Sequence, residues 1–306
     1  MVLNAEARLQ CKAAAEPRGT FYGVSPSGSQ DNTLLLARGT EAHMFTRNHF
    51  IWMAICLLLI IIGLRQLIKR RVPLRSVLAV CCVLAVFSEY IKVLSSVEML
   101  PLSGTDGNYP FLDLGHLPFH LCSIQILFIF YARFAQASPR RDTILAFMYP
   151  TCAAGAFFAL LLPSIFPSSI DISQAFTHPL AYQYFLWHCA LIVLGVYIPL
   201  SGEVRLSGRY YLITCGLLTV TAFATIYLNS ACSAAVYALG KPVSLDFATN
   251  FFFTMQTPIG LPLITRQQWM LYYLILHLLA YLLIGLLYLP FMKKDRARRG
   301  RRDVTI

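Results

Sequence analysis

The sequence predicts an all-α, polytopic membrane protein with about seven transmembrane helices. Hydrophobic residues make up 57% of the 306 residues and charged residues only 13%, which is far from the balance of a soluble domain. Apolar runs of about 20 residues, the length at which a helix crosses a bilayer, recur along the chain. The basic residues that produce the net charge of +11 lie in loops and at the C-terminal end, so the charge does not indicate a nucleic-acid partner.

The composition divides the chain into three regions. Residues 1–45 are rich in Ala, Gly, Ser and Pro and lack helical periodicity, which predicts a disordered tail without a secretory-type apolar core. Residues 46–292 hold the predicted seven-helix domain, and residues 293–306 form a basic tail. The expected spans are 48–67, 74–97, 118–134, 143–162, 182–200, 210–229 and 269–291.

Basic and non-basic loops alternate between these spans. The positive-inside rule assigns the basic loops to the cytosol, which places the N-terminus on the lumenal or outer side and the C-terminus in the cytosol. Residues 247–264 are apolar but are interrupted by Pro258, Gly260 and Pro262. We expect a re-entrant or interfacial segment there, because one more full span would move the C-terminus to the other side of the membrane.

The stretch 113–123 concentrates chemical groups at the entrance of the third span. It contains His116, Pro118, His120 and Cys122. Proline suits the first turn of a helix, so a helix beginning at Pro118 would place Cys122 one turn inside its N-terminal end, where unpaired N–H groups favour a thiolate. Alternatively, His116 and His120 share one helical face and hold a metal.

The other eight cysteines have no metal-type spacing, and most lie in apolar spans. We expect them to act as small packing residues.

Several polar residues are expected inside the outer half of the membrane. All seven histidines fall in that half, and His188, His277, Glu89 and Asn229 lie in or at the ends of spans. Ionisable groups inside a bilayer usually mark a site, so this grouping predicts one polar cavity between the second, third, fifth, sixth and seventh spans. The simpler interpretations are an intrahelical Glu89–Lys92 pair, a core His277 bonded to a carbonyl, and an Asn229 that only caps or links helices.

A family resemblance rests on the string His-Leu-Pro-Phe-His-Leu-Cys-Ser-Ile at 116–124. It is similar to the signature of the YwaF-like integral membrane proteins, which include animal acyltransferases acting on ether phospholipids. His188 followed by Pro199 in the fifth span, and Asn229 at the end of the sixth, occur in the order of that family. The resemblance covers about residues 45–292, and the region 229–262 departs from the bacterial pattern.

The resemblance implies transfer of a fatty acyl chain onto a lysophospholipid, with Cys122 as nucleophile. A thioester would divide one difficult acyl transfer into two easier steps. His188 or His120 would act as base, with Asn229, His116 and Glu89 binding substrate or the oxyanion. Residues 120 and 122 lie about 200° apart on an ideal helix, which favours His188. No cofactor is expected, and a cavity facing away from the cytosol favours a phospholipid donor over acyl-CoA. This lipid chemistry suggests the endoplasmic reticulum or Golgi membrane.

Two other classes of protein remain open. One is a metal-dependent lipid enzyme that uses His116 and His120 with His188 or Glu89. The other is a transporter or receptor in which Glu89 and its neighbours relay protons, although the spans show no inverted repeat.

Overall fold

A computed structural model describes residues 45–101, 107–163, 172–238, 249–258, 261 and 263–303. The chain divides into two units, Met1–Gly39 and Thr40–Ile306, and the described residues all belong to the second. The predicted N-terminal tail, residues 1–45, lies outside the described residues except for Phe45.

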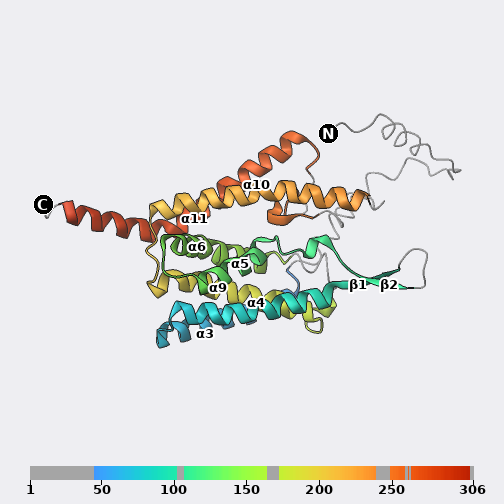
Figure 1. The fold of residues 1–306 in the computed structure, drawn as a ribbon, viewed down its shortest axis with the longest axis horizontal. Coiled ribbons are helices and arrows are strands. Elements are labelled where there is room, and N and C mark those ends of the chain that lie inside the picture. Colours follow the sequence, from blue (N-terminus) through green and yellow to red (C-terminus); the bar gives the residue numbers. More distant parts are fainter. Residues whose placement is uncertain are drawn as a thin grey trace. The chain divides into compact units, whose positions relative to one another are not determined.

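Within the described ranges, seven helical segments are long and apolar enough to cross a membrane. This confirms the prediction of an all-α polytopic membrane protein. In chain order the helices are α3 (Arg47–Arg70), α4 (Leu74–Ser96), α5 (Leu121–Phe134), α6 (Pro139–Pro150), α7 (Ala156–Leu161), α9 (Pro179–Ser201), α10 (Gly208–Ala238) and α11 (Arg266–Asp303) (Figure 1). The π-helix η2 (Thr151–Gly155) joins α6 to α7 within one span.

The helix ends follow local sequence signals. The Thr46 hydroxyl accepts a hydrogen bond from the His49 N–H, and the Ser138 hydroxyl accepts one from the Arg141 N–H, as N-cap side chains do. Pro179 occupies the first turn of α9, where its missing N–H costs no hydrogen bond. That helix ends at Gly202, whose φ of 74° is a left-handed conformation that glycine adopts without strain.

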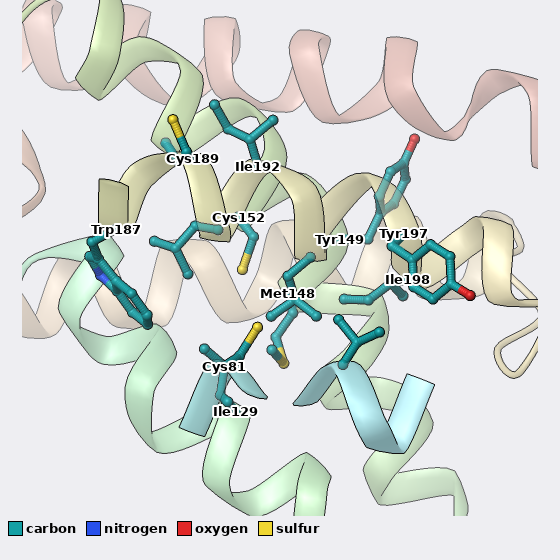
Figure 2. Close-up of a cluster of buried hydrophobic side chains, with 14 of the residues drawn as sticks. Cys81, Ile129, Met148, Tyr149, Cys152, Trp187, Cys189, Ile192, Tyr197 and Ile198 are labelled. Atoms are coloured by element: carbon teal, nitrogen blue, oxygen red, sulfur yellow. The ribbon is translucent and has the colours of Figure 1, made fainter. Parts of the chain in front are cut away.

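Helix α9 is the centre of the bundle. It packs against α3, α4, α6, η2 and α7, while α10 packs against α6 and α11. Helix α9 is apolar around most of its circumference, which is the pattern of a helix that is buried on several sides. Its contact with η2 is very close: a Cβ on Gly195 would lie 2.5 Å from the Ala153 nitrogen. Buried side chains from α5, α6 and α9, including Ile129, Met148 and Ile192, fill this core (Figure 2).

The loop expected between the second and third spans contains a β-hairpin. Strand β1 (Val97–Pro101) pairs antiparallel with β2 (Asn108–Leu112), with Val97 opposite Leu112. The 3-10 helix η1 (Leu114–His116) comes next in the chain. Hairpin and helix η1 together lead the chain into α5, as Figure 1 shows.

Two predicted spans have different ends in the structure. Helix α10 continues to Ala238, so Asn229 lies inside it and does not close it. Helix α11 runs to Asp303, so most of the expected basic tail, 293–306, continues the last helix, and residues 304–306 lie outside the described residues.

The predicted re-entrant segment, 247–264, is described only in part. Its described residues form turns and the 3-10 helix η4 (Phe251–Phe253). Another 3-10 helix, η3 (Ile172–Gln174), precedes α9.

Candidate functional site

The chain enters α5 through a tightly bonded turn. Asp113 accepts a hydrogen bond from the Gly115 N–H at 2.7 Å, and the His120 Nε2 lies 3.1 Å from the Gly115 carbonyl oxygen. Because a carbonyl can only accept, Nε2 carries the proton of the neutral ring. His120 is the N-cap of α5 and has extended backbone angles.

This turn corrects three expectations. The helix begins at Leu121 and not at Pro118, so Cys122 is its second residue and lies in the first turn itself. His116 ends the separate 3-10 helix η1, so His116 and His120 do not share a helical face. The angle of about 200° expected between residues 120 and 122 on an ideal helix does not apply either, because His120 lies outside the helix.

Cys122 is half-buried and has polar groups around its sulfur atom. The Ser123 side chain and the backbone of residues 122 and 123 act electrostatically on the thiol, while the Ser123 N–H itself donates to the His120 carbonyl at 3.0 Å. Lys92 is within electrostatic range of it. Burial opposes ionisation of a thiol, whereas helix N-terminal N–H groups and a nearby cation favour it. Both kinds of influence act on the Cys122 thiol, and burial is the larger.

Lys92 connects α4 to the polar residues at the start of α5. We call His116, His120, Cys122 and Lys92 the cluster around Cys122. Its Nζ lies 2.7 Å from Glu89 Oε2 and donates a hydrogen bond to Glu89 Oε1 at 2.9 Å. The predicted intrahelical pair is thus present. The Lys92 side chain is only 12% exposed, and its charge also acts on His116 and His120. Glu89 holds this cation beside the N-terminus of α5.

His188 presents an unpaired nitrogen in the interior of the bundle. Its Nδ1 lies 2.6 Å from the Tyr184 carbonyl oxygen, so Nδ1 holds the proton of the neutral ring. The buried Nε2 has no hydrogen-bond partner among the described residues and carries a free lone pair. His188 lies within electrostatic range of His120, which links it to the cluster around Cys122.

A buried polar network lies one turn below Cys122. The Gln125 amide donates to the Thr151 hydroxyl at 3.1 Å, and the Cys152 thiol donates to Gln125 Oε1 at 3.3 Å. Cys152 is within electrostatic range of both Cys122 and Cys81, and Figure 2 shows the sulfur atoms of Cys152 and Cys81 pointing toward one another.

Sequence reasoning missed this network. Two features of the sequence indicate such a buried polar network. Gln125 is a polar residue inside an apolar span, and Pro150, inside the fourth span, precedes the π-helix η2. Such π-helical turns are frequent at functional sites.

Asn229 holds the segment that covers the cluster. Its Nδ2 donates to the Phe251 carbonyl at 3.1 Å and to the Thr254 hydroxyl at 2.9 Å, and its Oδ1 accepts the Phe251 N–H at 3.0 Å. Phe251 then packs edge-on against the His120 ring, with a centroid distance of 4.9 Å. Both amide hydrogens are engaged, so the predicted oxyanion role would require one of these bonds to break.

His277 lies in the contact between α10 and α11. Its Nδ1 is 2.8 Å from the Tyr273 carbonyl oxygen, which is the carbonyl bond expected of a core histidine. The ring contacts Tyr273 and Tyr281, and Tyr281 in turn bonds Thr219. These contacts of His277 thus belong to a different helix pair from those of Cys122.

A metal centre was the alternative for the histidines. Over the ranges that the structure describes, no three His, Cys, Asp or Glu side chains group as metal ligands. The arrangement at the start of α5 is instead a thiol with imidazoles, an ammonium group and N–H donors.

The fold and the site define a class: a multi-pass helical membrane protein with a polar, thiol-containing cluster at one end of its bundle. The TMEM164 family model matches residues 43–288. The chain therefore belongs to the TMEM164 family of transmembrane proteins. No curated protein and no solved structure matches it.

Proposed function

We propose that this protein is a membrane-embedded acyltransferase that moves a fatty acyl chain from a phospholipid to a lysophospholipid through a thioester on Cys122. One observation supports this most: Cys122 lies in the first turn of a membrane helix, where the backbone N–H groups of the helix end and the Lys92 ammonium group act on its thiol. The resemblance of residues 116–124 to the acyltransferase members of the YwaF-like family agrees with it.

In the first half-reaction, the Cys122 thiolate attacks an ester carbonyl of the donor phospholipid. The carbon–sulfur bond forms, the ester carbon–oxygen bond breaks, and a lysophospholipid leaves. The leaving oxygen takes its proton from an imidazolium, for which His188 and His120 are the candidates. Backbone N–H groups at the start of α5 would stabilise the oxyanion.

In the second half-reaction, a lysophospholipid acceptor reacts with the thioester. The unpaired His188 Nε2 takes the proton of the acceptor hydroxyl as its oxygen attacks, and the thiolate is released. The two proposed half-reactions use no cofactor. The partners are therefore membrane lipids, with Glu89, His116 and Asn229 shaping the place where their polar parts bind.

The location of the site favours a phospholipid donor. In the proposed topology the N-terminal ends of α5 and α9 face the lumen or exterior, because the opposite loops are basic. Acyl-CoA is made in the cytosol and would not reach them. Lipid chemistry of this kind suggests an endoplasmic reticulum or Golgi membrane. Activity in sealed vesicles only when acyl-CoA is supplied on the cytosolic side would contradict a phospholipid donor.

The direct test compares two cysteine variants of the purified protein. Cys122→Ala is expected to abolish transfer from a phospholipid donor to a lysophospholipid acceptor. Cys215→Ala, which removes another half-buried thiol, should leave the rate close to wild type. If Cys122→Ala is fully active, the thioester mechanism is wrong.

A further inference from the structure

A second feature of the bundle is an open-sided cavity between α3, α4 and α9, with Leu59, Val80 and Leu84 of its lining exposed at the bundle surface. Its volume is about 420 Å³, within the range of about 300–1,000 Å³ typical of small-molecule sites. The lining is almost entirely apolar and includes Gly63 on α3, Val80, Cys81 and Leu84 on α4, and Val193 on α9. The absence of a side chain at Gly63 keeps α3 from filling the space beside Val193.

The cavity has the length of one leaflet of a bilayer. Its lining begins at Val72, just before α4, and continues on that helix from Ser76 to Leu84, a helical rise of about 12 Å at ~1.5 Å per residue. Half of a hydrocarbon core is about 15 Å thick. The cavity therefore runs from one membrane surface to near the midplane, which suits a single acyl chain.

The end of the cavity at the membrane surface is basic. Gln66 lines the cavity on α3, and Arg70 lies one helical turn further along the same face. Lys69, Arg70 and Arg71 are exposed there. The Tyr197 hydroxyl donates to the Val72 carbonyl and fixes the connection between α3 and α4 to α9. A phosphate at this end would meet positive charge directly beyond the apolar lining.

We infer that this cavity binds one acyl chain of an anionic phospholipid whose headgroup contacts the Lys69–Arg71 cluster. The site is separate from the cluster around Cys122. Cys81 lines the cavity, but neither Cys122 nor any other residue of α5 does. The inference therefore does not depend on the proposed acyl transfer.

The test uses the full chain in phosphatidylcholine vesicles that contain a small fraction of phosphatidylserine with a mid-chain diazirine. After irradiation, mass spectrometry locates the label. We expect label on the cavity-facing residues of α4 and α9, and unlabelled phosphatidylserine should compete for it. Cys122→Ala should be labelled like wild type, which keeps this result distinct from any failure of the proposed chemistry.

Two matched pairs of variants sharpen the test. Val80→Trp fills the cavity and should lower labelling on α9 severalfold, whereas Val83→Trp should not; the two valines are 59% and 56% exposed on the same helix. Arg70→Glu should weaken labelling, while Arg65→Glu, also exposed on α3, should leave it unchanged. Label spread evenly over lipid-facing residues, no competition, or equal effects within either pair would overturn the inference.

Discussion

His188 and His277 have the same local geometry in different surroundings. Each holds its Nδ1 proton against the carbonyl four residues earlier, and each has a buried Nε2 without a partner among the described residues. His188 is linked electrostatically to His120 and so to the cluster around Cys122, whereas His277 lies between α10 and α11. Substitution of His188 therefore tests for a catalytic base, and the same substitution of His277 is the control.

His188→Ala is expected to lower the rate of acyl transfer by about 10²–10⁴-fold, the usual contribution of a general base. His188→Gln, which keeps a polar side chain but cannot act as a base, should be similarly impaired. His277→Ala should retain most activity. The measurement is the initial rate of variants that elute as folded protein in size-exclusion chromatography; equal losses at the two positions would show that both histidines serve only packing.

Asn229 is expected to matter for stability. Asn229→Ala would leave the buried Phe251 N–H unpaired, at a cost of about 1–3 kcal/mol, and would leave the Phe251 carbonyl and the Thr254 hydroxyl with only their bond to each other. We predict a lower melting temperature and faster proteolysis within residues 249–258. Ser230→Ala is the control, since Ser230 is exposed and its hydroxyl bonds a carbonyl of its own helix. Unchanged stability with lost activity would instead support the oxyanion role.

Much of the cluster could be predicted at the scale of single residues. Cys122, His120, His116 and Lys92 are close in sequence or lie in polar positions of apolar spans, and the structure places Lys92 within electrostatic range of each of the other three. The bonds of Asn229 were not predictable, because its partners are more than twenty residues away in a segment without periodicity. Long-range polar contacts leave no local pattern.

At the scale of elements, the packing of α9 on η2 depends on one glycine. A Cβ at Gly195 would lie 2.5 Å from the Ala153 nitrogen and 2.9 Å from the Tyr149 carbonyl oxygen. These are backbone atoms and cannot move aside as a flexible side chain would. The close approach also positions η2, which carries Thr151 and Cys152 of the network below Cys122.

Gly195→Ala should therefore destabilise the bundle and weaken activity, whereas Gly216→Ala should be tolerated because nothing lies within 4 Å of its Cβ position. Alanine is the better helix former by about 1 kcal/mol, so propensity alone would stabilise both variants. Thermal unfolding in detergent, followed by tryptophan fluorescence, measures the difference. A melting temperature for Gly195→Ala at or above that of wild type would show that the close packing is absent.

The helices themselves were predictable because bilayer-spanning apolar runs are a strong signal. Their ends were less so. Pro118 predicted that the third span begins at that residue. The hydrogen bonds of Asp113 and His120 instead hold the preceding residues in a turn, and α5 begins at Leu121. The hairpin of β1 and β2 was also missed, because loops near a membrane surface carry no clear alternation of polar and apolar residues.

At the scale of the whole molecule, an odd number of spans puts the two termini on opposite sides of the membrane. The alternation of basic loops predicts a cytosolic C-terminus. In sealed microsomes, added protease should remove a C-terminal epitope tag and leave an N-terminal one intact. Removal of both tags would contradict the seven-span topology, and the reverse pattern would contradict the proposed position of the site on the lumenal side.

The proposed enzyme passes through a covalent state, and trapping that state is the most direct test. Purified protein is incubated with a phospholipid donor and no acceptor, quenched in acid, and measured by intact-protein and peptide mass spectrometry. We predict one added acyl group on Cys122 that hydroxylamine removes and that an added lysophospholipid accepts. Transfer of the acyl chain to product without any adduct on Cys122 would contradict the thioester mechanism.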